Sequence, residues 1–333
     1  NISFSQDSFS IPKFVAEIGC NHKGDVSIAK QMIVVAKTCG GDVAKFQKRT
    51  PRELLTPEQY QAPYENPQSY GKTYGEHREF LEFDIETHRK LKGYAEEHNI
   101  EYSTSVWDMT SAREVASIEP LTIKVPSACN NHIEMLEFLR DEYSGEVHIS
   151  TGMSTEGEIE QAVDIFAKCP ERVVLYHCVS GYPVSFDEVY LLEIACLKQT
   201  YQDTNRVRAI GFSGHHNGIA IDLFAPLLGA SVIERHFTLD RSWKGSDHAA
   251  SLEPQGFAKL VRDVFTGITV VVDMDLVNRR VAEAVKVRPV GRLFERDEVG
   301  DDRDRVRSIG AAECIKVGVV DRRVFLDEWS FTM

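Results

Sequence analysis

The feature that most constrains the fold is a repeated alternation of short β-branched runs with longer amphipathic stretches. Helical periodicity covers, for example, residues 28–38, 85–97, 110–117 and 156–167. Alternating strands and helices predict parallel strands joined by right-handed crossovers. Eight runs read as strands: Phe14–Ile18, Val43–Phe46, Tyr102–Ser105, Thr122–Val125, Val147–Ile149, Val173–Tyr176, Ala209–Phe212 and Val232–Glu234. We therefore predict an α/β fold, a (β/α)8 TIM barrel formed by residues 1–287.

A doubly wound open sheet is the structural alternative. Its dinucleotide-binding form would carry G-x-G-x-x-G after the first strand, whereas this strand ends in Glu17-Ile18-Gly19. Residues 51–82 form a polar, aromatic insertion, which predicts a functional or disordered loop. Residues 288–333 are dense in Arg and Asp and are predicted to be a C-terminal tail or small appendage of unclear fold.

Composition excludes several classes of partner. The formal net charge of -13 argues against nucleic acid and anionic membranes, although a few focused lysines can still bind a small anion. The 7 cysteines include no CxxC spacing, which indicates a reducing compartment. The chain shows neither a signal-peptide pattern at its start nor an apolar run of about 20 residues. We expect a cytoplasmic enzyme with small-molecule substrates.

Polar side chains end nearly every predicted strand, where barrels build their active sites. They are Glu17, Lys45, Gln47, Ser105, Lys124, Ser127, Ser150, His177, Ser213, His215, Glu234 and His236. Two ammonium groups, Lys45 and Lys124, with three of these serines suit a small, highly anionic ligand such as a phosphorylated carboxylic acid. Alternatively, each lysine pairs with a carboxylate. Lys45 stands on an apolar strand, two residues before Gln47, which argues against that pairing.

His215 and His236 follow neighbouring strands and predict a shared divalent metal that polarises a carbonyl group. Two unrelated polar histidines are the alternative, and His216 leaves open which ring points inward. Glu17 is a candidate general base, or a structural ion-pair partner of a lysine. Cys20 is predicted to be buried and inert rather than a metal neighbour.

Several longer motifs resemble the sialic acid synthase family. They are Ala16-Glu17-Ile18-Gly19-Cys20-Asn21-His22-Lys23-Gly24-Asp25, Lys45-Phe46-Gln47, Ser150-Thr151-Gly152-Met153, Glu234-Arg235-His236-Phe237-Thr238-Leu239-Asp240 and the loop from Trp243 to Pro254. The resemblance spans roughly residues 12 to 260. It implies condensation of phosphoenolpyruvate with an N-acetylmannosamine-type sugar, giving a nine-carbon 2-keto acid and phosphate.

The resemblance also implies roles for individual residues. His215 and His236 match ligands of a divalent metal, expected to be Mn²⁺, with Mg²⁺ and Co²⁺ as alternatives. Glu17, Gln47 and Asp247 match catalytic positions. The phosphoenolpyruvate site would comprise Lys45, Lys124, Ser127, Ser150, Ser180, Tyr182 and Ser213. The insertion and the Trp243 loop resemble the animal branch, which uses the sugar 6-phosphate; Lys72, Tyr74, Arg78 and Lys244 are the candidates to bind it.

The chain departs from the family pattern near the expected sugar. Cys129 and His132 replace an acidic residue and an asparagine, and Ser180 is asparagine in some members. A deaminated or differently decorated acid, or a shorter 2-keto sugar acid, therefore stays open as the product. A non-catalytic sugar-phosphate-binding barrel and a hydrolytic metalloenzyme are alternatives of other classes. Residues 288–333 do not resemble the family's antifreeze-like domain, which reaches across a dimer; a homodimer is still expected.

Overall fold

The computed structural model describes residues 11–268, and their strands form one closed barrel. All eight predicted strands are present and each pairs in parallel with both neighbours. Their bounds are β1 Lys13–Gly19, β2 Val43–Lys48, β3 Glu101–Val106, β4 Thr122–Val125, β5 Glu146–Ser150, β6 Val173–Cys178, β7 Ala209–Gly214 and β8 Ala230–His236. The predicted barrel is confirmed, and most strands extend one to three residues beyond their apolar runs.

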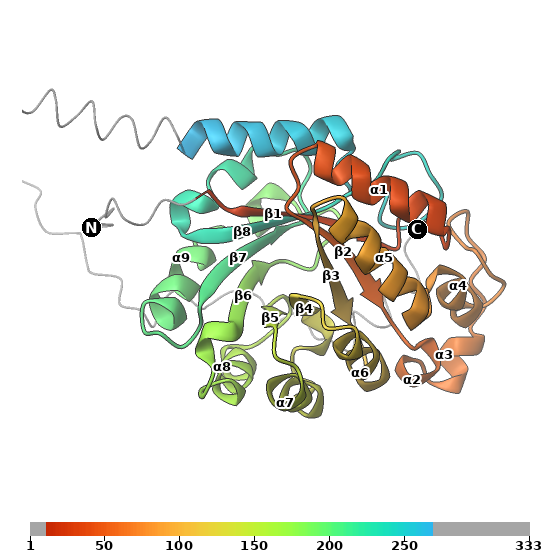
Figure 1. The fold of residues 1–333 in the computed structure, drawn as a ribbon, viewed down its shortest axis with the longest axis horizontal. Coiled ribbons are helices and arrows are strands. Elements are labelled where there is room, and N and C mark those ends of the chain that lie inside the picture. Colours follow the sequence, from red (N-terminus) through yellow and green to blue (C-terminus); the bar gives the residue numbers. More distant parts are fainter. Residues whose placement is uncertain (1–10, 269–333) are drawn as a thin grey trace, which may run out of the picture.

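Helices surround the strands, as Figure 1 shows. They are α1 Val26–Thr38, α5 Ile85–Glu97, α6 Met109–Ser117, α7 Ile133–Glu142, α8 Glu156–Ile165, α9 Glu193–Leu197 and an unlabelled helix over residues 254–268. Side-chain caps at Asp25, Asp84, Asp108 and Thr155 satisfy backbone N–H groups at four helix starts. Short turns complete the connections: η2 Ser127–Cys129, η3 Pro170–Arg172, η4 Phe186–Glu188, η5 Lys198–Gln202, η6 Ile221–Leu223 and η7 Pro226–Leu228.

The insertion over residues 51–82 contains three short helices, so of the two predicted alternatives, a functional or a disordered loop, the disordered one was wrong. It contains α2 Pro51–Leu54, α3 Pro57–Gln61 and α4 Tyr74–Leu81, which lie together to one side of the barrel in Figure 1. Reciprocal capping boxes begin two of them, Thr56 with Gln59 and Thr73 with Glu76. These local hydrogen bonds stabilise the starts of the helices. The helices themselves are too short to show a clear hydrophobic period in the sequence.

The barrel interior changes from apolar to charged along the strands. A small apolar layer of Val15, Val43, Val174, Tyr176 and Val232 fills its lower half. Because side chains alternate along a strand, the next inward positions on β1, β2 and β8 are Glu17, Lys45 and Glu234. The outward faces of the strands pack against the helices and form the two larger apolar clusters. The fold therefore seals the barrel below and leaves charge at its upper mouth.

Two further sequence predictions concern membrane spans and the C-terminal part of the chain. Within residues 11–268, no helix combines the length and apolarity needed to cross a membrane. The tail predicted over residues 288–333 lies outside the described residues, as does the end of the predicted barrel domain, 269–287.

Lowering the pH from 7 to 5 is expected to lower the free energy of unfolding, because three buried histidines stay neutral in the fold. Burial lowers the pKa of His22, His88 and His148 to about 3. An unfolded histidine titrates near about 6.5, so the unfolded chain takes up protons first as the pH falls. Each histidine then lowers the unfolding free energy by up to about 1.4 kcal/mol per pH unit below 6.5. Urea denaturation at pH 7, 6 and 5 measures the slope.

A pair of variants tests whether the buried histidines cause the pH dependence of the unfolding free energy. His88→Gln removes one buried imidazole but keeps a polar partner for Tyr102, whose hydroxyl lies 2.7 Å from His88 Nδ1, and should flatten the pH dependence. His132→Asn changes an exposed histidine and keeps a side-chain cap for α7, and should leave the slope as in the wild type. Equal unfolding free energies at pH 7 and 5 would contradict the expectation.

Candidate active site

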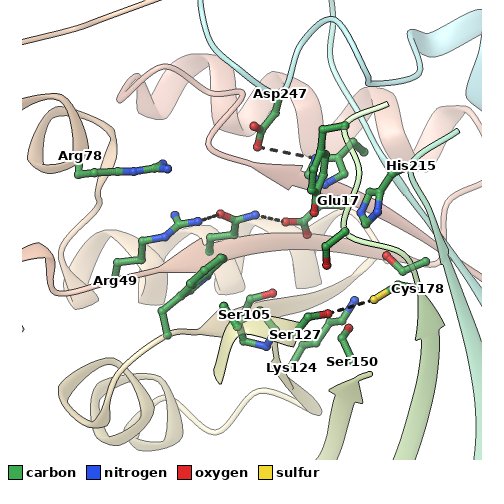
Figure 2. A pocket seen from close by; sticks show the side chains of 18 of the residues that line it. Glu17, Arg49, Arg78, Ser105, Lys124, Ser127, Ser150, Cys178, His215 and Asp247 are labelled. Carbon is green, nitrogen blue, oxygen red and sulfur yellow. Dashed lines mark hydrogen bonds and ion pairs between the residues drawn. The ribbon is translucent and has the colours of Figure 1, made fainter. Parts of the chain in front are cut away.

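A cavity of about 290 Å³ opens at the carboxyl ends of the strands. Every polar strand-end residue predicted from the sequence lines it except His177, whose Nε2 instead lies 2.8 Å from the carbonyl oxygen of Val189. The cavity also contains Ser180, Tyr182 and Asp247 from the loops that follow β6 and β8. Figure 2 shows Lys124, Ser127, Ser150 and Cys178 together on one side of this cavity. The predicted catalytic, anion-binding and metal-binding residues therefore share one site.

Strand register explains why residues distant in sequence meet here. Glu17 on β1 lies opposite Lys45 on β2 and opposite His236 on β8. On the other edge of β8, Ser213 of β7 lies opposite Glu234. Inward-facing side chains near the upper end of a closed barrel converge on its axis, so these residues and Lys124 of β4 share one cavity.

Both lysines in this cavity have carboxylate partners. Lys124 Nζ lies 2.6 Å from Glu234 Oε1. Lys45 Nζ lies 3.5 Å from Glu234 Oε2 and pairs closely with Glu17 Oε2. The argument that Lys45 would avoid a carboxylate was therefore wrong, and the ion-pair alternative for Glu17 is what the structure contains. Two ammonium groups and two carboxylates have a formal net charge of zero. These four side chains, which we call the charged floor of the cavity, are those of Lys45, Lys124, Glu17 and Glu234.

The partners of these groups set their protonation. Burial opposes the charge on Lys45, but the carboxylates of Glu17 and Glu234 outweigh it and raise the pKa of this ammonium group. Burial lowers the pKa of Lys124, and Glu234 offsets only part of that effect. Burial also opposes ionisation of Glu234, yet Lys124 and Lys45 hold the pKa of this carboxyl well below its usual range. Mutual attraction among Lys45, Lys124 and Glu234 therefore stabilises their charges at this buried place.

The two predicted metal ligands are close and available. The ring centroids of His215 and His236 lie 5.5 Å apart. His215 Nδ1 lies 2.8 Å from the carbonyl oxygen of Val179, which leaves Nε2 as the free ring nitrogen. Burial, reinforced by His236, lowers the pKa of His215 to about 3 and keeps the imidazole neutral. Nδ1 of His236 is buried with no hydrogen-bond partner among the described residues. Two adjacent imidazoles, each with a ring nitrogen that makes no hydrogen bond within residues 11–268, fit a divalent cation.

The structure also decides which of the two adjacent histidines faces the cavity. His215 lines the cavity, whereas His216 turns into a buried cluster with Asp222 and Arg235. Arg235 donates to the carbonyl oxygen of His216 at 2.7 Å and forms an ion pair with Asp222. This cluster anchors the backbone that carries His215.

The insertion builds the outer wall of the cavity. Tyr74 and Arg78 of α4 line it, and Figure 2 shows Arg78 extending into the cavity from the side opposite His215. Arg78 Nε donates to the Tyr74 hydroxyl at 3.0 Å, and no carboxylate of residues 11–268 forms an ion pair with this guanidinium. Lys72 and Lys244 are exposed and do not line the cavity. Of the four predicted sugar-phosphate residues, the structure brings only Tyr74 and Arg78 to the site.

Sequence reasoning missed several residues that line the cavity. They include Arg49, Tyr64, Trp107 and Cys178, and Glu234 was noted only as a strand end. Arg49 had a detectable signal, since Lys45, Gln47 and Arg49 follow the two-residue period that places side chains on one face of a strand. Tyr64 and Trp107 had none, because loops after strands follow no period.

Of the three residues that depart from the family pattern, only Ser180 lines the cavity. Cys129 and His132 do not line the cavity: the Cys129 thiol lies 3.2 Å from the carbonyl oxygen of Trp107, and His132 caps α7. Cys20 packs against Arg49 rather than the histidine pair, and burial raises the pKa of its thiol to about 11. Cys20 is partly rather than fully buried, and the raised pKa of its thiol agrees with the prediction that it is inert.

Gly19 makes the contact between Glu17 and Gln47 sterically feasible. The β1–β2 register shifts between Glu17 and Gly19, and Gly19 has φ +54°. A Cβ at this position would lie 3.1 Å from Gln47 Nε2 and 3.2 Å from Glu17 Oε1. A residue without a side chain therefore suits both the left-handed backbone and the close approach.

Comparisons with known proteins agree on one group of relatives. The model of the NeuB family matches residues 32–272. Human N-acetylneuraminate-9-phosphate synthase is 40% identical over 250 residues, which cover 75% of this chain and 68% of the human protein. N,N'-diacetyllegionaminic acid synthase of Campylobacter jejuni is 33% identical over 254 residues, covering 75% and 74% of the two chains.

A solved structure supports the same relationship. The N-acetylneuraminic acid synthetase of Leptospira borgpetersenii, crystallised in complex with citrate, superposes with a TM-score of 0.68 at 30% identity. The match covers 79% of this chain and 85% of that one.

Proposed function

Because the chain belongs to the NeuB family of synthases, we propose that it condenses phosphoenolpyruvate with an N-acetylmannosamine 6-phosphate. The products would be a nine-carbon 2-keto acid 9-phosphate and inorganic phosphate. The observation that carries the proposal is one cavity in which two lysines and several serines stand beside a pair of adjacent histidines. The relatives are synthases of nonulosonic acids, which supports this class of reaction.

Phosphoenolpyruvate would bind at the charged floor. Its carboxylate and phosphate are anions that Lys45 and Lys124 can receive when Glu17 and Glu234 give up part of their pairing. Hydroxyl donors surround these ammonium groups; they belong to Ser127, Ser150, Ser180, Tyr182 and Ser213. Until the substrate arrives, the two carboxylates keep the lysines charged in a buried place.

The sugar would occupy the outer half of the cavity, under the insertion. Arg78 supplies a guanidinium with no carboxylate partner among the described residues, which suits a phosphate group. The rings of Tyr64, Tyr74 and Trp107 offer apolar surface for the sugar and its substituent. This half supports a phosphorylated acceptor rather than the free sugar.

A divalent metal such as Mn²⁺, held by His215 and His236, would polarise the aldehyde oxygen of the sugar. The chain's own groups would then direct the remaining chemistry. The C2=C3 double bond of phosphoenolpyruvate opens as C3 bonds to the aldehyde carbon, a water oxygen bonds to C2, and the C2–O bond to phosphate breaks as the C2=O bond forms. Of the two protons that the water gives up, one ends on the former aldehyde oxygen and one on the released phosphate. Glu17, which contacts Gln47 and Lys45, would accept the first proton of that water. Asp247, 3.9 Å from His236, stands on the sugar side of the site.

Phosphate release from phosphoenolpyruvate tests the function. With Mn²⁺ present, we expect release to depend on N-acetylmannosamine 6-phosphate and to be at least about 10-fold slower with the free sugar, because one charged phosphate contact would be lost. Mannose 6-phosphate and the acceptors of legionaminic and pseudaminic acid synthesis complete the panel. A clear preference for the free sugar would overturn the 6-phosphate assignment. No release with any acceptor would overturn the synthase itself.

A further inference from the structure

Arg49 is a buried cation in the cavity to which the proposed reaction assigns no part. It follows the last residue of β2 and is 8% exposed. Its Nη1 lies 3.3 Å from Cys20 Sγ and 3.3 Å from Glu82 Oε1, and its backbone N–H donates to Glu82 Oε2 at 2.8 Å. The guanidinium also lies 4.1 Å from the ring centroid of Trp107. It is therefore held on several sides by the protein.

The remaining contact of Arg49 points toward the reaction centre. Arg49 Nη2 donates to Gln47 Oε1 in a short hydrogen bond, and Gln47 Nε2 donates to Glu17 Oε1 at 2.6 Å. Figure 2 shows this row, with Arg49, the amide and Glu17 linked end to end. The row continues to Lys45, which pairs with the other oxygen of Glu17.

This row determines which way the Gln47 amide faces. An amide can turn its oxygen or its NH2 group toward a neighbour with little change in shape. A guanidinium has only donors, so Arg49 can donate only to the amide oxygen, and the NH2 group then faces Glu17. Cys20 supports the same orientation, since its thiol lies 3.8 Å from Gln47 Oε1.

Arg78 lines the same cavity but has a different environment. Among residues 11–268 it donates one hydrogen bond, to Tyr74, and has no carboxylate partner. Arg49, by contrast, uses both Nη groups on protein atoms. Protein atoms therefore engage three N–H donors of Arg49 but only one of Arg78, which leaves more donors of Arg78 for a substrate phosphate.

We propose that Arg49 is a positioning residue, which fixes the Gln47 amide and through it the orientation of the Glu17 carboxylate. This role rests on the proposed function, because it assumes that Glu17 acts on the reacting water. Arg49 itself touches neither substrate. Without it, Gln47 can rotate and Glu17 loses a donor that holds one of its oxygens.

Two matched variants separate positioning from substrate binding. Arg49→Met should lower kcat by about 100-fold with both the free and the phosphorylated acceptor, as expected when a reacting group is misplaced, and leave KM for phosphoenolpyruvate within about 3-fold. Arg78→Met should instead raise KM for the phosphorylated acceptor alone. Arg49→Lys, which keeps one donor near Gln47 Oε1, should recover part of the lost kcat. A selective effect of Arg49→Met on KM for the phosphorylated acceptor would overturn the positioning role.

A double-mutant cycle with Gln47 gives a second test that also applies if Arg49→Met folds poorly. If Arg49 acts through the amide, Arg49→Lys should lower kcat in the wild-type background but change it less than about 2-fold in Gln47→Met. Additive losses would overturn the proposal. An active wild type with unimpaired Arg49 variants would refute this role alone, whereas an inactive wild type would refute the proposed function and this role together.

Discussion

Replacing His236 by alanine is expected to abolish measurable phosphate release in the presence of Mn²⁺. The side chain is 8% exposed at the end of β8, and its Nδ1 has no hydrogen-bond partner among residues 11–268. Removing it leaves His215 as a single imidazole, which is too few for a stable divalent site. We expect a loss of roughly 1000-fold or more in kcat/KM, corresponding to about 4 kcal/mol of transition-state stabilisation.

Metal binding should be measured beside activity. Calorimetric titration with Mn²⁺ is expected to show one site in the wild type and none in His236→Ala, while phosphoenolpyruvate still binds. His177→Gln is the matched control, because His177 is a buried strand-end histidine outside the cavity lining. It should keep both metal binding and activity. Full activity of His236→Ala in the presence of a chelator would refute the metal site.

Lys124→Met is expected to weaken phosphoenolpyruvate binding by at least about 100-fold and to destabilise the fold. Lys124 Nζ lies 2.6 Å from Glu234 Oε1, and both side chains are almost fully buried. The variant leaves the Glu234 carboxylate with Lys45 at 3.5 Å and Ser213 at 3.0 Å. An under-compensated buried charge costs about 3 kcal/mol of unfolding free energy. Urea denaturation and phosphoenolpyruvate titration measure the two effects.

The double variant Lys124→Met/Glu234→Gln separates charge balance from substrate binding. Neutralising Glu234 removes the unpaired charge, so much of the lost stability should return. The affinity for phosphoenolpyruvate should not return, because the ammonium group is still missing. Recovery of affinity in the double variant would show that Lys124 is not part of the anion site.

The sequence was enough to predict the barrel and the end of the barrel at which the candidate active site lies. Eight β-branched runs separated by helical periods were enough to predict the strands, because the burial of parallel strands on both faces selects such residues. The polar residues that end these runs marked the mouth of the barrel, and His215 and His236 followed from adjacent strands. These features are local or depend only on strand order, so a sequence pattern records them.

Tertiary structure alone decided how these groups pair. Barrel closure and strand register place Glu17 between Lys45 and His236, and bring Glu234 to Lys124 across the barrel. No pattern within one segment encodes such contacts. The same holds for the contacts of Arg49 with Cys20 and Glu82, which come from two other segments of the chain. The sequence gives the chemical type of each side chain. The charge balance of the site depends on the distances between side chains of different strands, and these are fixed only when the barrel closes.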